Sequence, residues 1–237
     1  MAKIISVLSG KGGVGKTTTA INIAYHIEQL NEDAIVVDGN LYSPNLALHL
    51  GSDHYPITIH DVLADEHRIT NAVYQHTSGV KVVPGEPTAS NLDHVEPHDF
   101  HQHITDLHLH ADYIIIDGTA ELSDNADALV EHSDEILLIT TPDRATVTNT
   151  RRVERFVQNK NGVLNGVVLN KYRWFSFSDL AKTSIQKHLD APIVQTIPHH
   201  RKFRQALHQR EPFSHRYPWR KPTRSFKEIA SHITNRV

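Results

Sequence analysis

Residues 10–17 have the composition and spacing of a loop that binds phosphate. The stretch reads GKGGVGKT, in which two glycines separated by four residues precede Lys16 and Thr17. Glycines let backbone N–H groups turn inward around an anion, and a following helix adds partial positive charge. Lys16 would reach the β- and γ-phosphates, and the Thr17 hydroxyl would bind Mg²⁺. The sequence therefore predicts a nucleoside triphosphate site formed by Gly10, Gly12, Gly13, Val14, Gly15, Lys16, Thr17 and Thr18.

The elements around this loop fit that role. Short apolar runs predict strands at 3–8, 34–38, 80–83, 113–117, 135–140, 166–170 and 193–196. Helices are expected at 17–30, 123–132, 146–159 and 178–189, with Thr146 starting the third and Ser178 with Asp179 capping the fourth. The alternation predicts an α/β fold with a mostly parallel, doubly wound sheet flanked by helices. We expect one domain over residues 1–237.

The composition excludes several other kinds of site. The 237 residues carry a formal net charge of −3 and include no cysteine, which excludes disulfides, thiolate zinc sites and cysteine-held iron–sulfur clusters. No secretory signal and no apolar run of about 20 residues is found, so we expect a cytoplasmic protein. Histidines crowd residues 94–110, where His98 and His101 would share a helix face. Their spacing matches no zinc pattern, and we predict a solvated helix without metal.

The loop also contains a second lysine, Lys11, which a phosphate-binding loop does not ordinarily need. The stretch SGKGGVGKTT resembles the deviant Walker A loop of the MinD/ParA family of P-loop ATPases, and of its MinD-like members most. In that family the extra lysine crosses to the nucleotide of the partner subunit in an ATP-held sandwich dimer. The resemblance implies that Lys11 is both a dimer contact and a catalytic group beside Lys16. A positive charge supplied by a partner would stabilise the charge that spreads during hydrolysis.

The resemblance continues through both switch regions. IVVDGNLYSPNLALHLG is similar to the family's second strand and switch I. It implies that Asp38 orders the Mg²⁺ shell and that Asn45 touches nucleotide across the dimer. ADYIIIDGTAELSD is similar to the Walker B strand and switch II, where Asp117 would hold a Mg²⁺-bound water. The resemblance thus predicts a metal site formed by Thr17, Asp38 and Asp117.

Two later segments resemble the part of the family fold that holds the base. VVLNKY places Asn170 at the position that reads the adenine edge. TIPHHRKFRQALHQREPF resembles the segment that wraps the base, with Pro198 at its turn and His199 directly after it. ATP and Mg²⁺ are therefore the expected ligands.

Two positions depart from the family pattern. Asn40 stands where the family has an aspartate that is thought to position the attacking water. Asparagine cannot accept a proton, so we expect ATP binding and dimerisation to persist while hydrolysis slows by on the order of 10²–10⁴-fold, which would trap the ATP dimer. The sequence leaves open whether Asn40 is natural or was introduced. Residues 118–121 read GTAE in place of Thr-Pro-x-Gly, which leaves open the switch II amide that meets the γ-phosphate.

The resemblance implies an ATP switch for intracellular positioning, of a division site, cargo or chromosome, with a regulatory or cargo protein as further partner. Alternatives are an ATP-binding scaffold or a cofactor-assembly ATPase with little turnover, although members resembling the latter use paired cysteines. The target surface stays open between a membrane, DNA and a protein. Apolar residues at helical spacing near the end would form a membrane stripe or, as we favour, the packed face of a last helix: Phe226, Ile229, Ile233 and Val237.

Other clusters offer further surfaces. Two basic groups would suit nucleic acid, one on each of two helices: Arg151, Arg152 and Arg155, and Arg201, Lys202 and Arg204. Three aromatic residues in an expected loop would form either a partner surface or a hydrophobic cover: Trp174, Phe175 and Phe177.

Overall fold

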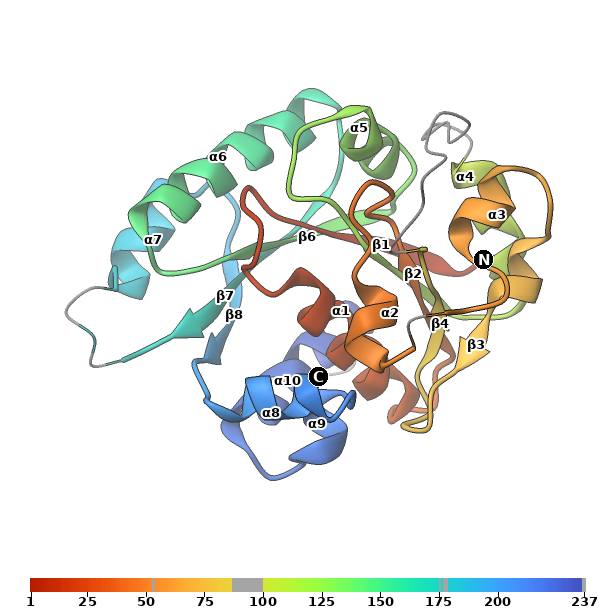
Figure 1. Ribbon diagram of the computed structural model, residues 1–237. Helices are drawn as coiled ribbons and strands as arrows, with labels where there is room; N and C mark the ends of the chain where they lie inside the picture. The colour runs from red at the N-terminus through yellow and green to blue at the C-terminus, as the bar shows by residue number, and fades with distance from the viewer. Residues whose placement is uncertain (53, 87–99, 175, 177–178, 236–237) are drawn as a thin grey trace.

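The computed structural model describes residues 1–52, 54–86, 100–174, 176 and 179–235 (Figure 1). Among these residues, eight strands form one sheet in the order β3-β4-β2-β5-β1-β6-β7-β8. All neighbouring strands pair in parallel except β3 and β4, which are antiparallel. The strands are β1 (Lys3–Leu8), β2 (Ala34–Asp38), β3 (Tyr74–Gln75), β4 (Lys81–Val83), β5 (Tyr113–Asp117), β6 (Glu135–Thr140), β7 (Leu164–Tyr172) and β8 (Ile193–Pro198).

The central strand β1 shows why these runs are apolar almost throughout. Successive side chains of a strand point to opposite faces of the sheet. Ile4 and Leu8 enter the core on one face, whereas Ile5 and Val7 enter the core on the other. Because helices cover both faces, neither set of side chains reaches solvent. The sequence pattern of buried parallel strands is therefore confirmed.

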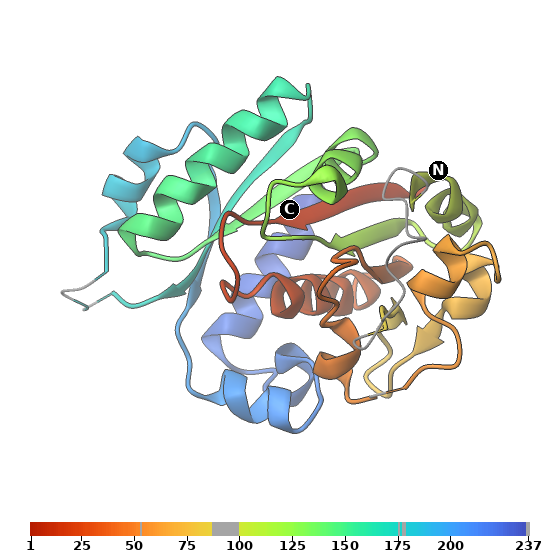
Figure 2. The ribbon, with the colours of Figure 1, turned by 45° about the horizontal axis from the view of Figure 1, so that its top comes forward.

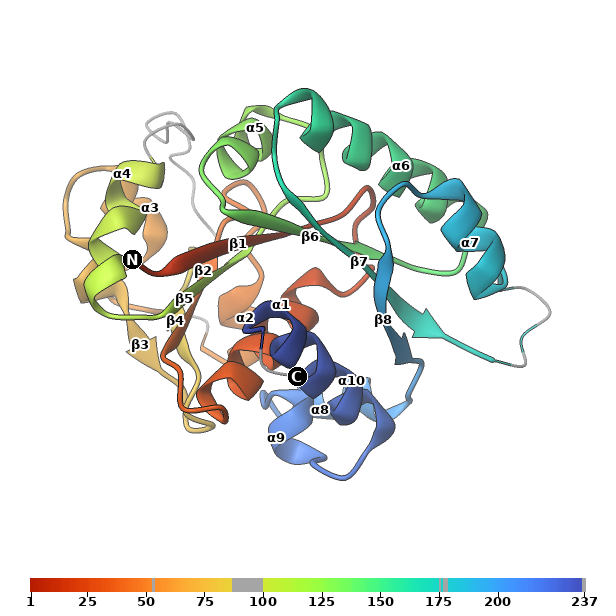
Figure 3. The same ribbon diagram turned by 180° about the vertical axis from the view of Figure 1, so that it is seen from behind.

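The helices divide between the two faces of the sheet (Figures 1, 2 and 3). One face packs against α3 (Ile59–Leu63), α4 (Phe100–Thr105), α5 (Asp124–Glu131), α6 (Arg144–Asn159) and α7 (Lys182–His188), with 3₁₀ turns at Ile69–Ala72 and Asp106–Leu109. The other face packs against α1 (Lys16–Glu28), α2 (Leu46–Leu50), α8 (Lys202–His208), α9 (Phe213–Arg216) and α10 (Lys221–Ile233). This arrangement confirms the predicted doubly wound α/β fold.

Two predicted helix starts are wrong. Helix α6 begins at Arg144 rather than at Thr146, because the Asp143 carboxylate caps it by accepting the backbone N–H of Thr146. Helix α7 begins at Lys182, with Ala181 at the N-cap. Asp179 accepts hydrogen bonds from Arg173 instead of capping that helix, and Ser178 lies outside the described residues.

The last helix uses its apolar stripe as a packing face. Phe226, Ile229 and Ile233 are fully buried in the core that α10 shares with α1 and β8. The alternative of a membrane stripe is therefore wrong for these three residues, and Val237 lies outside the described part. No helix within the described ranges is long and apolar enough to cross a membrane.

Candidate nucleotide-binding site

The predicted phosphate-binding loop leaves the carboxyl end of β1 and leads directly into α1. Gly15 is the N-cap of α1 with φ of 104°, a left-handed conformation that favours glycine. A Cβ atom there would lie 2.4 Å from the amide nitrogen of Asn170. A Cβ at Gly10 would meet the backbone carbonyl carbon of Asn149 at 2.5 Å. The glycines thus allow the loop to lie against β7 and α6.

The loop forms one wall of a cavity of about 1470 Å³ at the carboxyl edge of the sheet. Other walls come from switch I, residues 118–124, β7 and the start of α8. Most predicted site residues line this cavity: Gly10, Lys11, Gly12, Gly13, Gly15, Lys16, Thr17, Thr18, Asn40, Asn45, Asn170 and His199. Val14 is buried behind the loop, and Pro198 ends β8 outside the cavity lining. Open α/β sheets place ligands at this edge.

Lys16 is held inside the subunit. Its ammonium donates a hydrogen bond to the Ser9 hydroxyl at 3.2 Å, and that hydroxyl in turn donates to the carbonyl of Lys11 at 2.8 Å. Burial lowers the pKa of Lys16, and the negative charge of Asp117 opposes this shift. A half-buried ammonium that lines the cavity beside a glycine loop is well placed to meet phosphate charge.

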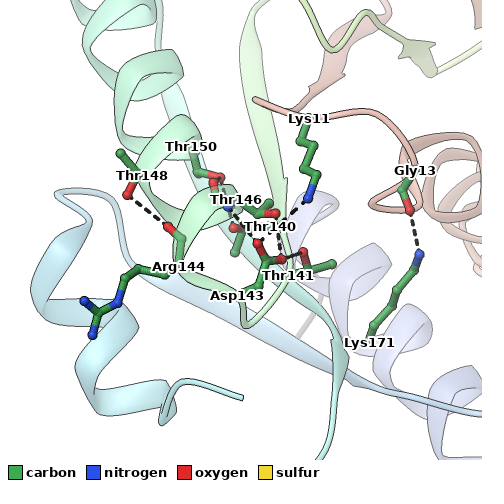
Figure 4. A network of polar contacts seen from close by, with 10 residues as sticks. All are labelled: Lys11, Gly13, Thr140, Thr141, Asp143, Arg144, Thr146, Thr148, Thr150 and Lys171. Carbon is green, nitrogen blue, oxygen red and sulfur yellow. Dashed lines mark hydrogen bonds and ion pairs between the residues drawn. The ribbon is translucent and has the colours of Figure 1, made fainter. Parts of the chain in front are cut away.

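Lys11 lies in a different environment on the same loop. Its side chain is 53% exposed, and its ammonium lies 3.9 Å from the carboxylate of Asp143 (Figure 4). That carboxylate is already bound by the Thr141 and Thr146 hydroxyls and the Thr146 N–H. These hydrogen bonds help to hold the pKa of Asp143 below its ordinary value, although burial opposes them. An exposed pair at this distance contributes at most about 1 kcal/mol, so Lys11 is only loosely held.

Strand β7 supports the opposite side of the loop. The Asn170 amide donates to the carbonyl of Val14 at 2.7 Å, and the Lys171 ammonium donates to the carbonyl of Gly13 at 2.5 Å (Figure 4). Lys171 has φ of 57°, and its N–H donates back to the Asn170 side chain at 2.7 Å. These contacts fix the loop against a strand that lies far along the chain.

Two carboxylates lie side by side beneath the cavity. Asp38 and Asp117 end the adjacent strands β2 and β5 in register, and both are buried. Asp38 accepts backbone N–H groups from Asn40, Asn45 and Leu46. Burial raises the pKa of Asp38, and the neighbouring charge of Asp117 raises it further. Burial likewise raises the pKa of Asp117, which the Thr17 hydroxyl and the Lys16 charge partly counter.

This pair fits a magnesium ion. One oxygen of Asp117, Oδ1, is buried and has no hydrogen-bond partner among the described residues. Carboxylate and hydroxyl oxygens are the donors that Mg²⁺ prefers, and it commonly uses one or two carboxylates together with substrate phosphates. Within the described ranges no group of three or more His, Cys, Asp or Glu residues could hold a metal alone. The fit therefore requires bound phosphate beside Thr17, Asp38 and Asp117.

The predicted switch I asparagines both turn toward one backbone group. The amides of Asn40 and Asn45 each donate to the carbonyl of Ser43 at 2.6 Å. Their backbone N–H groups bind Asp38, so the loop closes around that carboxylate. The buried carboxylate and this loop thus form one connected unit.

The other predicted clusters lie apart from the cavity or supply only part of its wall. Arg151 is paired with Asp190 and with Glu154, which neutralises one member of the first basic group. In the second group Arg201 and Arg204 line the cavity mouth. His101 stacks on His132 at 4.3 Å, whereas His98 lies outside the described residues.

The predicted aromatic loop is described only in part. Trp174 is 60% exposed and meets the Tyr172 ring edge-on at 5.0 Å. Phe175 and Phe177 lie outside the described residues.

Sequence reasoning did not identify three residues that shape the site. Ser9 and Lys171 stand directly beside the predicted Gly10 and Asn170, so adjacency was the available signal. Asp143 lies three residues before Thr146, which is the spacing of an N-cap. All three residues make contacts that depend on the folded backbone.

Comparison with known proteins agrees with this geometry. The family model ParA, described as "NUBPL iron-transfer P-loop NTPase", matches residues 1–234. The chain belongs to the ParA/MinD family of P-loop NTPases. Its eight-stranded, mostly parallel sheet flanked by helices is the fold of the MinD structures that it matches.

Solved structures of the ParA/MinD family include two that match nearly the whole chain. The cell division ATPase MinD of Pyrococcus furiosus is 30% identical, with a TM-score of 0.92 and complete coverage of both chains. The septum site-determining protein MinD of Pyrococcus horikoshii OT3, solved with Mg-ADP, is 30% identical with a TM-score of 0.91, covering 98% of this chain and 96% of that one. An uncharacterized ATP-binding protein of Methanocaldococcus jannaschii is 24% identical over 233 residues, covering 98% of this chain and 88% of that protein.

Proposed function

We propose that the chain is an ATPase that switches between a monomer and an ATP-held sandwich dimer and takes part in intracellular positioning. The observation that carries the proposal is the contrast between the two lysines of one loop. Lys16 is half-buried and bound to Ser9 close to Asp117, whereas Lys11 is exposed at the cavity and loosely held. One lysine suffices for the nucleotide bound within the subunit. The other is free to meet a second nucleotide.

Within a subunit, different residues are proposed to contact the triphosphate, the Mg²⁺ ion and the base. The N–H groups of residues 10–17 and the start of α1 bind the triphosphate, and Lys16 balances its negative charge. Thr17, Asp38 and Asp117 would hold Mg²⁺, which neutralises phosphate charge when bound. Asn170, which lies against the loop, and His199, which also lines the cavity, are proposed to face the base.

Across the dimer, Lys11 is proposed to stabilise the charge that develops on the partner's γ-phosphate. Asn40 orients the attacking water by hydrogen bonding and cannot accept its proton. Turnover is accordingly slow, and the ATP dimer is long-lived. Residues 1–237 are proposed to act as one ATPase domain.

The positioning role follows from the relatives, two of which are named as MinD proteins of cell division and septum site determination. The family description also mentions iron transfer. This chain has no cysteine to hold an iron–sulfur cluster, so we favour positioning over cluster transfer.

The experiment that tests the proposal is light scattering in Mg²⁺–ATP and separately in Mg²⁺–ADP, with phosphate release followed in parallel. A mass near twice 26.7 kDa in ATP alone, persisting for hours, is expected. A monomer in both nucleotides would overturn the dimer. A dimer that releases no phosphate, with Asn40 or with Asp in its place, would leave only an ATP-binding scaffold.

A further inference from the structure

The cavity contains acidic side chains that the proposed function does not use. Asp38 and Asp117 lie beneath the cavity and are assigned to Mg²⁺. Of the described residues that line the cavity itself, two are acidic, Glu121 and Asp124, and both are exposed. Asn40, which is proposed to orient the attacking water, cannot accept a proton. Glu121 and Asp124 are therefore the carboxylates available to accept the proton that Asn40 cannot.

The loop between β5 and α5, which carries these two carboxylates, is fixed at both ends. The Gly118 N–H donates to the carbonyl of Val7 at 3.1 Å, which holds the start of the loop against the end of β1. The buried Asn125 amide donates to the carbonyl of Gly39 at 2.8 Å. Gly39 directly precedes Asn40. The loop therefore reaches from the start of the phosphate-binding loop to the residue before Asn40.

The order of the strands places the loop between β5 and α5 beside the end of the triphosphate. Strands β2 and β5, which carry Asp38 and Asp117, lie on one side of β1, whereas β7, which carries Asn170, lies on the other. In phosphoryl transfer Mg²⁺ bridges the β- and γ-phosphates. With the metal on Asp38 and Asp117 and the base near Asn170, as proposed, the γ-phosphate points toward β2 and β5. The loop after β5 then borders the terminal phosphate.

Three histidines also line the cavity and can accept protons. His199 and His200 follow β8, on the other side of β1 from β5. His49, on α2, shares a small second cavity with Phe203 and Leu207 of α8. These histidines thus lie toward α8, on the side assigned to the base.

Glu121 and Asp124 differ in what holds them. Asp124 is the first residue of α5, where an acidic side chain favours the helix dipole and so has a structural explanation. Glu121 lies within the loop, where its N–H donates to the hydroxyl of the buried Thr119 at 3.2 Å. In the described structure its carboxylate has no hydrogen-bond or ion-pair partner. A negative charge on the wall of a triphosphate cavity opposes binding, so Glu121 has no explanation in affinity or in folding.

We propose that Glu121 is a catalytic residue of ATP hydrolysis, which accepts the proton of the attacking water while Asn40 orients that water. The inference deepens the proposed function and rests on it, since it names the proton acceptor of the same site. Because no contact within the described structure fixes the Glu121 carboxylate, it reaches the water in only a fraction of its conformations. Turnover is therefore slow, but faster than in a site without a proton acceptor.

Hydrolysis with Glu121 as the proton acceptor needs no further reactant. The water oxygen forms a bond to the γ-phosphorus, while the bond from that phosphorus to the β–γ bridging oxygen breaks and its electron pair stays on ADP. The proton of the water passes to a carboxylate oxygen of Glu121. Since the Glu121 side chain is exposed, it then returns this proton to solvent, and ADP and phosphate leave.

The first test is Glu121→Gln, which keeps the size of the side chain and removes its capacity to accept a proton. At saturating Mg²⁺–ATP the rate of phosphate release should fall by on the order of 10²-fold. Affinity for a fluorescent ATP analogue should stay within about threefold or become tighter, because the opposing charge is lost. The ATP dimer, followed by light scattering, should persist longer.

Glu66→Gln is the matched control, since it makes the same change at an exposed glutamate that lies outside the cavity lining. Its rate, affinity and dimer lifetime should match those of the parent. A rate of phosphate release that Glu121→Gln leaves unchanged would overturn the proposal.

The second test repeats Glu121→Gln in the Asn40→Asp protein. The carboxylate introduced at position 40 accepts the proton there, so Glu121→Gln should now lower the rate by less than about threefold. A role of Glu121 in the shape of switch II alone would cost the same factor in both proteins, and that result would overturn the proposal. A loss in Asp124→Asn that Glu121→Gln does not share would make Asp124 the acceptor, and the proposal would be wrong.

These measurements also separate the role of Glu121 from the ATP switch. If the parent dimerises in ATP and releases phosphate at a rate that Glu121→Gln does not change, the switch stands and the role of Glu121 fails. If only the Asn40→Asp protein releases phosphate, the site is an ATPase in which Glu121 accepts no proton. If neither protein releases phosphate, the proposed ATPase fails and the role of Glu121 fails with it.

Discussion

The two ends of the phosphate-binding loop differ in how firmly they are held. The end near α1 carries Lys16, which is half-buried, bound to Ser9 and close to Asp117. The end near β1 carries Lys11, which is half-exposed with one distant partner, Asp143. The proposed function uses this difference, with a fixed cation for the subunit's own nucleotide and a mobile cation for another molecule. Substitutions at the two ends should therefore have different effects, on nucleotide binding and phosphate release at one end and on dimerisation at the other.

The largest effect is expected at the fixed end. Lys16→Ala should lower phosphate release by on the order of 10³-fold, because a half-buried charge facing the phosphates is lost. Binding of a fluorescent ATP analogue should weaken as well. Lys187→Ala, an exposed lysine on α7, is the matched control and should leave both values unchanged. Activity of Lys16→Ala within about tenfold of the parent would contradict the assignment of the fixed cation.

A gain of activity is expected in switch I. Asn40→Asp restores a group that can position water and accept its proton, so phosphate release should rise by at least about 10²-fold. The lifetime of the ATP dimer should shorten in the same preparation. The gain should vanish when Lys11→Ala is added, because the charge supplied by the partner is then missing. A gain that survives without Lys11 would break the proposed division between the two lysines.

Substitution of Lys11, at the mobile end of the loop, is expected to weaken the association of two subunits into the ATP dimer. Lys11→Ala should weaken the ATP dimer by more than about 30-fold, as the loss of one partner in a desolvated charge contact does. Its affinity for nucleotide as a monomer should stay within about threefold of the parent. Lys11→Arg keeps the charge and serves as the control. Equal loss of nucleotide affinity and dimerisation would show that Lys11 works within its own subunit.

The buried carboxylates predict a pH dependence. Burial raises the pKa of Asp38 and Asp117 above the ordinary 3.8, so the folded protein without metal holds protons that the unfolded chain releases. Its free energy of unfolding should fall as pH rises through the interval between the unfolded and the raised values. Mg²⁺–ADP binding should release these protons and strengthen by up to about tenfold per pH unit for each proton released within that interval.

Calorimetry in buffers of different ionisation enthalpy measures that proton release. Asp117→Asn should release fewer protons than the parent, because only the Asp38 carboxyl of the pair is then left to lose one. Binding of Mg²⁺–ADP without proton release by the parent would show that the carboxylates are already ionised.

The smallest effect concerns Asp143, which contacts Lys11 and caps α6. Asp143→Ala should lower the free energy of unfolding by about 1 kcal/mol, the usual value of an N-cap. Asp143→Asn keeps the capping oxygen but replaces the oxygen that accepts from the Thr141 and Thr146 hydroxyls, so its loss in urea should lie between zero and that of Asp143→Ala. Lys11→Gln should unfold like the parent, and a large loss in that variant would show that the pair with Asp143 stabilises the fold and that Lys11 is not mobile.

The sequence predicted the elements that carry a strong local pattern of apolar residues. Strands β1, β2, β5 and β6 were predicted with their observed bounds because their apolar runs are long and buried on both faces. The two-residue strand β3 and the five-residue helices α2 and α3 were missed. Elements this short have too few residues to show a periodicity.

The site divides in the same way. Residues that follow one another, such as Gly15, Lys16 and Thr17, were recognised from spacing alone. The contact between Asn170 and Val14 depends on where β7 lies in the sheet. Sequence spacing does not predict a contact between residues so far apart in the chain.

Strand β7 runs on to Tyr172, where its end reaches the phosphate-binding loop, and this has a consequence for synthesis. The bonds from Asn170 and Lys171 to the loop join residues 156 and 158 positions apart. The loop is made among the first twenty residues, yet its far support leaves the ribosome only when most of the chain exists. In a growing chain that folds from its N-terminus, the loop would thus be present long before β7 is available to fix its conformation. Tight nucleotide binding would then begin only when synthesis of the chain is nearly complete.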